Sequence, residues 1–473
     1  MRALFAPEVL TVNAEARRSL FRAAPGRVPS GLCRPALVAV VLLMGCGARP
    51  PTVRRVGGAV SGLVGTGLVL QDNGNSDLAV NTDGPFAFAM AEGTRYSVTV
   101  LTQPTVPAQI CAVTDGEGVL GSGDVTDVAV SCRLYSPRFA YVTNCGSNTI
   151  SILAVNATTG ELRPVDQVAS QGGCPYAIAF DPAGKFAFVA NGGAVSAYSI
   201  DAATGALTTV VGSPFPAGTS PFGVTVDPKG RFVYLANRLS DDVSAYAIDA
   251  RGALAAVAGS PFPAGSRPHS VTVDPSGRFA YVGNFESDDI SAYRIDDGGA
   301  LTPGFDIPSG DGPNVVAIHP SGRFAYVSHW GSGDVQAYTV DPESGVFTRT
   351  GEAALAGTFA RFTTIEPWGR FVYVASYGGN SVSAFTIDGA TGALAPMPGS
   401  PFQAGSAPLG LTVDPSGTFA YVTNYGSETD PGNDTITIYR IDASSGALEL
   451  IQTITVGDRP SSIAILRGVD PIP

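Results

Sequence analysis

The sequence predicts an all-β chain in which a small β-sandwich precedes a seven-bladed β-propeller. A Gly-Arg-Phe-Ala-Tyr-Val phrase recurs in close variants, and three further short apolar runs accompany each copy. A period in the mid-forties with four short runs per unit is typical of a propeller with four-stranded blades. The repeat phenylalanines are 47, 46, 47, 45, 47 and 48 residues apart, at Phe139, Phe186, Phe232, Phe279, Phe324, Phe371 and Phe419.

The N-terminal residues 1–56 have the pattern of an export signal followed by a short tether. Arg27 and Arg34 precede the apolar stretch 36–44, which is too short to remain in a bilayer as a spanning helix. The Leu-Met-Gly-Cys sequence that ends at Cys46 resembles the lipobox of bacterial lipoproteins, in which the cysteine is lipidated. The alternative is an ordinary secretory peptide that is cleaved nearby.

The cysteines agree with export. Besides Cys33 and Cys46, which lie in the leader, the chain has four cysteines. An even set in an exported chain predicts two disulfides. A metal site is disfavoured, because no Cys-x-x-Cys spacing occurs and no histidine is near either pair. The expected pairs are Cys111 with Cys132 and Cys145 with Cys174.

Residues 57–133 carry short alternating runs between Gly, Asn and Asp turns, which predicts a small β-sandwich. The pattern resembles the Ig-like or prealbumin-like modules that hold larger domains away from a bacterial envelope. The segment contains no histidine and no cluster of acids, so we expect it to be a spacer.

The propeller is expected over residues 137–467, and residues 278–322 illustrate one blade. Residues 278–284, 290–295 and 313–318 are β-branched and aromatic runs, and a third strand opens at Ala300. Each blade buries its faces against two neighbours, so the ring must close. The first unit lacks an inner strand before it and a spare one follows the last, so residues 460–465 are expected to complete the first blade.

Composition excludes some functions. The chain has 28 Lys and Arg against 40 Asp and Glu, and this net charge of −12 argues against nucleic acid as a partner. No serine-hydrolase elbow, zinc-protease helix or phosphate-binding glycine loop occurs, and we expect no cofactor and no metal. Residues 426–434 gather three acids, which leaves a calcium site open, but a solvated loop is the better interpretation.

Two units contain Tyr-Val-Thr-Asn, at residues 141–144 and 421–424, and these letters name the YVTN propeller repeat. The units as a whole resemble the lactonase-type seven-bladed propellers, which include 6-phosphogluconolactonases and muconate-lactonizing cycloisomerases. That resemblance covers residues 137–467. It implies a mouth at one end of the ring, where His, Arg and Glu polarise an ester carbonyl and position water.

The family's residues are only partly present. Arg361 matches a Pro-Arg strand of the family, with Ala360 in place of the proline, and His269 matches a Pro-His position. The stronger Gly-Pro-Arg-His and Asn-Glu motifs are replaced by residues 312–315 (Gly-Pro-Asn-Val) and 328–330 (Ser-His-Trp). Glu286 lies one residue away from an Asn-Glu register in an earlier blade.

Two sets of positions are expected to meet at the mouth. The residue after the inner-strand proline reads Tyr176, Phe222, His269, Asn314, Arg361, Leu409 and Ser461. The fifth residue after the repeat phenylalanine is asparagine in five units, and the exceptions are His329 and Ser376. The catalytic candidates are Arg361, His269 and His329, and the ligand-binding candidates are Asn314, Trp330, Tyr377 and Glu286. Their alternative role is to line or pack the mouth without chemistry.

The sequence therefore favours a non-catalytic platform that binds a small lactone-like or sugar-like molecule or an envelope protein. It would be lipid-anchored in the cell envelope, on the periplasmic or extracellular face. The alternative is an extracytoplasmic lactone hydrolase that uses Arg361 to polarise the carbonyl and His269 or His329 as the base. A third possibility is a scaffold with apolar contact loops at residues 214–216, 261–263 and 401–402.

Overall fold

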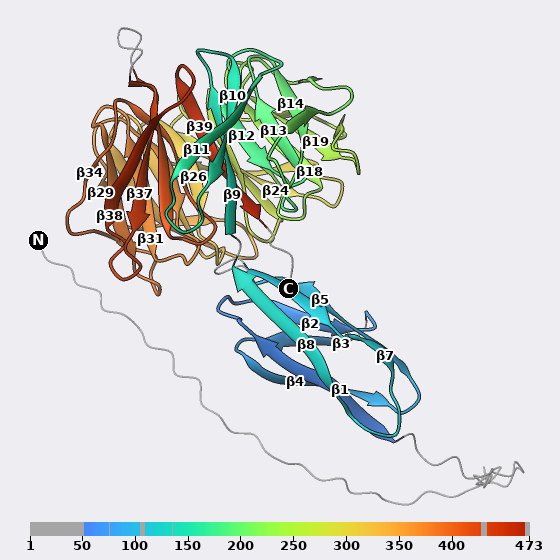
Figure 1. Ribbon diagram of the computed structural model, residues 1–473. Coiled ribbons are helices and arrows are strands. Elements are labelled where there is room, and N and C mark those ends of the chain that lie inside the picture. Colours follow the sequence, from blue (N-terminus) through green and yellow to red (C-terminus); the bar gives the residue numbers. More distant parts are fainter. Residues whose placement is uncertain (1–51, 75, 105–108, 135, 427–432, 469–473) are drawn as a thin grey trace, which may run out of the picture. The chain divides into compact units, whose positions relative to one another are not determined.

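The computed structural model describes residues 52–74, 76–104, 109–134, 136–426 and 433–468 (Figure 1). The described residues form strands and turns, which confirms the all-β prediction. None of them belongs to a helix that is long and apolar enough to cross a membrane. The expected leader, with Cys46, lies outside the described residues.

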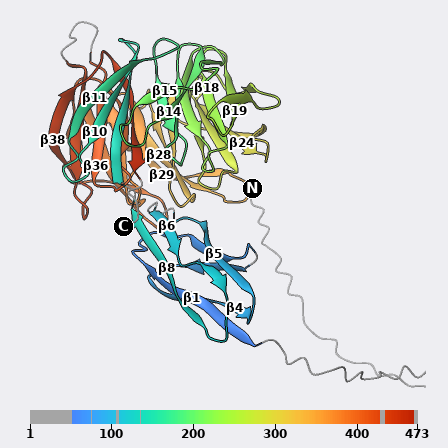
Figure 2. The ribbon, with the colours of Figure 1, turned by 45° about the vertical axis from the view of Figure 1, so that its right-hand side comes forward.

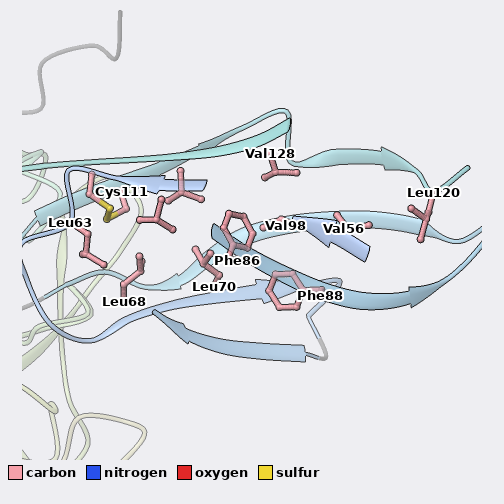
Figure 3. Packing of buried hydrophobic residues seen from close by; sticks show 13 residues of the cluster. Val56, Leu63, Leu68, Leu70, Phe86, Phe88, Val98, Cys111, Leu120 and Val128 are labelled. Atoms are coloured by element: carbon pink, nitrogen blue, oxygen red, sulfur yellow. A yellow bond between two sulfur atoms is a disulfide. The ribbon is translucent and has the colours of Figure 1, made fainter. Parts of the chain in front are cut away.

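The N-terminal strands form two four-stranded sheets, with the orders β4-β1-β8-β6 and β3-β2-β5-β7. Both sheets contribute to one hydrophobic core, in which Val56, Leu70, Phe88 and Val98 are buried (Figure 3). The strands are β1 (Val53–Ser61), β2 (Leu68–Asp72), β3 (Ser76–Val80), β4 (Gly84–Ala91), β5 (Arg95–Thr102), β6 (Gln109–Thr114), β7 (Glu117–Val119) and β8 (Val125–Leu134).

The predicted boundary at residue 57 needs a correction. Strand β1 begins at Val53, and Val56 is fully buried in the core of the sheets. The last residues of the expected tether therefore already belong to a strand, in which Arg55 is exposed and Val56 is buried.

Both expected disulfides are present. Cys111 and Cys132 lie directly opposite each other on β6 and β8, and Cys145 pairs with Cys174 at the mouth side of the first two blades. Two disulfides are typical of a protein that folds outside the cytoplasm.

Each of the seven repeat units forms an antiparallel sheet (Figure 2). We number the blades 1 to 7 from Phe139 to Phe419. The inner strands of blades 1 to 7 are β39 (Pro460–Gly468), β12 (Ala177–Phe180), β17 (Pro221–Val226), β22 (Pro268–Val273), β26 (Pro313–Ile318), β30 (Ala360–Ile365) and β35 (Pro408–Val413). The second strands are β9 (Ser136–Asn144), β13 (Phe186–Ala190), β18 (Phe232–Asn237), β23 (Phe279–Asn284), β27 (Phe324–His329), β31 (Phe371–Ser376) and β36 (Phe419–Asn424).

The remaining two strands of each blade lie toward the rim of the ring. The third strands are β10 (Thr149–Val155), β14 (Ala194–Ile200), β19 (Asp242–Ile248), β24 (Asp289–Ile295), β28 (Asp334–Val340), β32 (Ser381–Ile387) and β37 (Thr435–Ile441). The outer strands are β11 (Leu162–Ala169), β15 (Leu207–Thr209), β20 (Leu254–Ala256), β25 (Leu301–Pro308), β29 (Phe347–Leu355), β33 (Leu394–Pro396) and β38 (Leu448–Thr455).

The C-terminal strand closes the ring as expected. Strand β39 pairs antiparallel with β9, with Ile463 opposite Val142, so the sheet of blade 1 has the order β11-β10-β9-β39. Figure 1 shows red β39 beside teal β9. One blade is thus built from both ends of the propeller, which holds the first and last units together.

A repeated contact, which we call the clasp, joins successive blades. Tyr281 of blade 4 donates a 2.9 Å hydrogen bond to the carbonyl oxygen of Gly345, in a turn of blade 5. The neighbouring Phe279 packs under the same glycine, where an added Cβ would lie 2.6 Å from the phenylalanine ring. Gly345 also has a φ of 76°, so the turn needs a residue without a side chain. The equivalent clasp between Tyr421 and Gly160 connects blade 7 to blade 1.

The three Ser-Pro-Phe segments pack within the ring. They form the short strands β16 (Phe215–Pro216), β21 (Phe262–Pro263) and β34 (Phe402–Gln403), each paired with the third strand of its own blade. Phe262 is only 9% exposed, and Tyr293 of the next blade donates a hydrogen bond to the Pro263 carbonyl. These contacts join blades within the chain, so the phenylalanines of the segments pack inside the ring while the adjoining prolines stay exposed.

We predict that Tyr281→Phe lowers the free energy of unfolding by about 1–3 kcal/mol, because it leaves the Gly345 carbonyl without its partner. Chemical denaturation measures this. Tyr338→Phe is the matched control, since the equally buried Tyr338 hydroxyl makes only a 3.5 Å contact with Ser309. If both variants lost the same free energy of unfolding, the proposed contribution of the clasp to stability would be contradicted.

Candidate functional site

Each blade contributes one residue to a cavity at the axis of the ring. This residue is the one that follows the proline, or Ala360 in blade 6, at the start of the inner-strand motif. The cavity has a volume of about 220 Å³. Its lining includes Tyr176, Phe222, His269, Asn314, Arg361, Leu409 and Ser461, as the repeat register predicts.

Local backbone geometry explains why these side chains point inward. In six blades the pairing between the inner and second strands shifts register at this residue; in blade 4, for example, Pro268 pairs with Asn284 and Ser270 with Gly283. His269, between them, is the extra residue. A bulge of this kind bends the strand and redirects a side chain. In these six blades the bulge therefore turns the first residues of the inner strand toward the axis.

His269 is buried in an aromatic stack and is 6% exposed. Its ring lies between Phe222, at 4.8 Å, and Phe285, at 4.4 Å, with interplanar angles of 28° and 21°. Burial lowers the pKa of His269 to about 3, and the positive charges of Arg361 and Arg267 add to this effect while Asn314 opposes it. His269 is therefore a neutral ring at physiological pH.

Arg361 brings a cation into the same cavity. Its guanidinium carbon lies 5.5 Å from the centre of the Phe222 ring and 5.4 Å from that of Trp330. Burial lowers the pKa of Arg361 to about 10, while Tyr377, Tyr425 and Tyr176 oppose the shift, so the group stays charged at neutral pH. Within the described part of the chain, no carboxylate forms an ion pair with it.

Three neighbouring polar side chains in the cavity wall lack hydrogen-bond partners among the described residues. They are both ring nitrogens of His269, Oγ of Ser270 and Nδ2 of Asn314; the Asn314 side chain lies close enough to His269 to raise its pKa, but not in the geometry of a regular hydrogen bond. Ser270 is 8% exposed and Asn314 is 3% exposed. Burying a polar group without a partner costs free energy, and native proteins rarely do so. Three such groups beside an unpaired cation therefore indicate a place for a ligand.

His329 does not belong to this group. It is 2% exposed and does not line the cavity. Its Nε2 accepts a 3.0 Å hydrogen bond from the Gly310 amide, and its Nδ1 lies 2.6 Å from a carboxylate oxygen of Asp334. Asn284 makes the equivalent contact with Asp289 in blade 4. His329 thus takes the place and the contacts of the repeat asparagine, outside the cavity in which it was expected to act as a base.

The other candidates lie around the cavity. Trp330 stacks on Phe359 at 4.6 Å and 15°, and lies 5.4 Å from Tyr377. Glu286 forms a 2.5 Å ion pair with Arg267, is half exposed, and does not line the cavity. Asn314 is the one ligand-binding candidate that lines it.

No metal site is indicated by the described residues, which contain no cluster of three or more potential ligands. Most of the loop considered for calcium, residues 427–432, lies outside them.

Sequence reasoning missed Ser270 and Phe285. Phe285 is the sixth residue after its repeat phenylalanine, a position that also holds Trp330, Tyr377 and Tyr425. Alignment of the repeats at this position would have shown that four blades carry an aromatic residue there. Nothing in the sequence marks Ser270, whose missing hydrogen bond is visible only in three dimensions.

We predict that His269→Phe makes stability less sensitive to acid. The unfolded chain binds a proton near pH 6.5, whereas native His269 does so only near pH 3. Wild-type stability therefore falls as the pH drops through this window, by about 1.4 kcal/mol per pH unit for this group. Denaturant unfolding at several pH values should show that the free energy of unfolding falls less steeply with decreasing pH in the variant. If it falls equally in both proteins, the assigned pKa of His269 is contradicted.

Known proteins resemble the propeller in sequence. A family model described as "Lactonase, 7-bladed beta-propeller" matches residues 133–221 and 213–317. The 6-phosphogluconolactonase of Bacillus subtilis (strain 168) is 36% identical over 84 residues, which cover 17% of this chain. The match spans about a quarter of that relative, 24% of its length. Arg361 lies beyond the residues that the family model matches.

Solved structures share the fold. The periplasmic gluconolactonase of Pseudomonas aeruginosa has a TM-score of 0.59 at 21% identity, over 71% of this chain and 100% of its own. A protein from Lactobacillus plantarum has a TM-score of 0.60 at 22% identity, over 70% of this chain and 100% of its own. Together with the repeat motif, these findings show that residues 137–467 form a seven-bladed β-propeller, which is similar in sequence to the lactonase-type propellers over residues 133–317.

Proposed function

We propose that this protein is a non-catalytic binding platform of the cell envelope whose mouth cavity holds a small organic anion. One observation carries the proposal: Arg361 lines the cavity without a carboxylate partner among the described residues, beside the unpaired polar groups of His269, Ser270 and Asn314. Arg361 is half-buried, and a charge that is partly removed from water without a partner costs free energy, which an anionic ligand would offset.

The polar groups match an anion. A guanidinium presents its N–H donors in a planar fork that suits a carboxylate, and the Asn314 Nδ2 and Ser270 hydroxyl are further donors. No aspartate or glutamate lines the cavity in the described residues, so nothing there repels a negative charge.

The same geometry argues against turnover. A general base works best when its pKa is near the operating pH. Burial holds the pKa of His269 near 3, and His329 is engaged by Asp334 and Gly310. Glu286, the remaining candidate, points to Arg267. The cavity thus offers a cation for binding without a well-matched base.

Lactone hydrolysis is the second candidate. Arg361 and His269 line one cavity, where the cation would polarise a lactone carbonyl and the neutral imidazole would take a proton from water. The match to a protein named 6-phosphogluconolactonase favours this chemistry, and the weak basicity of His269 opposes it.

The proposed location rests on separate observations. The disulfides are typical of proteins outside the cytoplasm, and the sequence around Cys46 resembles a lipobox. We therefore place the protein in the cell envelope, anchored by lipid at Cys46, on the periplasmic or extracellular face.

We predict that calorimetry detects binding of at least one small carboxylate from a panel of acetate, benzoate and gluconate. Arg361→Gln should weaken that binding roughly tenfold or more, because a charged hydrogen bond is lost. Arg238→Gln is the control, since Arg238 also lies over Phe222 but does not line the cavity. No binding of any carboxylate would overturn the proposal.

The same proteins should show no hydrolysis of sugar or aliphatic lactones in a pH-stat. Turnover that Arg361→Gln abolishes and Arg238→Gln preserves would establish the lactone hydrolase instead.

We predict that Cys46→Ser releases the protein from membranes. After detergent phase separation of cells, wild type should partition with the detergent and the variant with the aqueous phase, because one lipidated cysteine is the anchor. Cys33→Ser, in the expected leader, is the control. A variant that stays in the detergent phase would contradict lipid attachment at Cys46.

A further inference from the structure

We infer that the ligand of the mouth cavity is a planar, apolar carboxylate, such as a benzoate-like acid, rather than a sugar acid. This inference rests on the proposed function and narrows it to one chemical class. Three features of the cavity support it: the aromatic wall, the position of the cation, and the Phe359-Ala360 sequence that precedes Arg361 in blade 6.

The wall beside the cation is aromatic. The rings of Tyr176, Phe222, His269 and Phe285 follow one another with centroid separations of 4.7, 4.8 and 4.4 Å. The first three of these rings line the cavity directly, and Leu409 and Phe362 add apolar surface. A flat ring gains both apolar burial and ring–ring contact against such a wall.

A polyhydroxylated acid fits this wall less well than a flat ring does, because the polar atoms of His269, Ser270 and Asn314 are too few to bond every hydroxyl of such an acid once its carboxylate is held. Each sugar hydroxyl that enters the cavity must regain the hydrogen bonds it gives up in water, or the complex loses free energy. Carboxylates are the strongest side-chain acceptors for hydroxyl groups, and none lines the cavity in the described residues. The Ser461 hydroxyl is already engaged, because it donates to the carbonyl of Pro175.

The cation sets the orientation. Arg361 lies over Phe222 on one side and Trp330 on another, and Asn314 belongs to the adjacent blade. A carboxylate held by Arg361 and Asn314 would leave the rest of the ligand against Phe222 and His269. The cavity of about 220 Å³ is smaller than typical drug-sized pockets of roughly 300–1,000 Å³, which favours a single ring.

The blade that carries the cation departs from the repeat sequence, since Ala360 replaces the proline that precedes this position in the other blades. Blade 6 reads Phe359-Ala360-Arg361 where blade 5 reads Gly312-Pro313-Asn314. Phe359 has a φ of 57°, a left-handed conformation that a bulky residue rarely adopts, and its side chain is 41% exposed. The equivalent residues Ser220, Arg267, Gly312, Ala407 and Arg459 have the same left-handed conformation. Blade 6 is therefore distinguished by the bulky Phe359 side chain, which stacks on Trp330 beside Arg361.

The test compares four probes by calorimetry on the wild-type protein: benzoate, benzamide, cyclohexanecarboxylate and gluconate. We expect benzoate to bind at least about tenfold more tightly than each of the others, because benzamide lacks the charge, cyclohexanecarboxylate is not planar, and gluconate is a polyol. These comparisons need no variant, so they do not depend on a mutant that folds.

Two variants locate the contact. Phe222→Leu should weaken benzoate binding about tenfold by removing the aromatic face, while Phe305→Leu, at an exposed position on outer strand β25, should leave it unchanged. Thermal melting verifies that both variants fold.

The outcomes separate the two proposals. If gluconate or cyclohexanecarboxylate binds as tightly as benzoate and depends on Arg361, the aromatic class is overturned while anion binding stands. If benzoate binding does not change in folded Phe222→Leu, the inferred wall is wrong. If no carboxylate binds, both proposals fail.

Discussion

The clasp between neighbouring blades is the constraint on which the rest of the propeller depends. A ring of sheets has no single core, so each blade must be held by the next. The repeat phenylalanine packs under a turn glycine of the following blade, and in six blades a tyrosine two residues later donates to that glycine's carbonyl. Blade 2 has Phe188 at the tyrosine position and keeps only the packing half of the contact. The closing pair of Tyr421 and Gly160 repeats the rule, and β39 adds strand pairing at the same junction.

The clasp also explains why the mouth can vary. The clasp is formed by residues in the first half of each second strand. The mouth is formed by residues that follow the end of that strand. In blade 4 these are Phe279 and Tyr281 at one end of β23 and Phe285 just past the other. The bulge at the start of the inner strand then sends one more side chain to the axis. Each blade therefore contributes to the cavity through positions that the ring does not need for its stability.

Much of this architecture could be predicted from the sequence, because it depends on periodic patterns. The repeat spacing predicted the blades, the spare strand at residues 460–465 predicted the closure, and the even cysteine count predicted the disulfides. The register of the repeat also placed His269 and Arg361 at one cavity.

The differences between the expectations and the structure depend on contacts that no sequence pattern records. His329 stands at an asparagine position, and an imidazole there suggests a base. Its hydrogen bonds to Gly310 and Asp334 exist only once the loop around it has folded. The first sandwich strand was placed too late for a similar reason, since the burial of Val56 requires the opposing sheet.

The properties of the cavity are linked to one another, and this favours binding over catalysis. Packing His269 between Phe222 and Phe285 creates the aromatic wall, and the same burial lowers the pKa of His269 and so removes the base. The nearby charge of Arg361 lowers it further, although that charge is what an anion requires. A lactonase needs the cation and a competent base together, whereas a binding site for a flat anion needs the cation and a neutral wall. The described cavity has the cation and the neutral wall, because an arrangement of rings that excludes water from His269 also lowers its basicity.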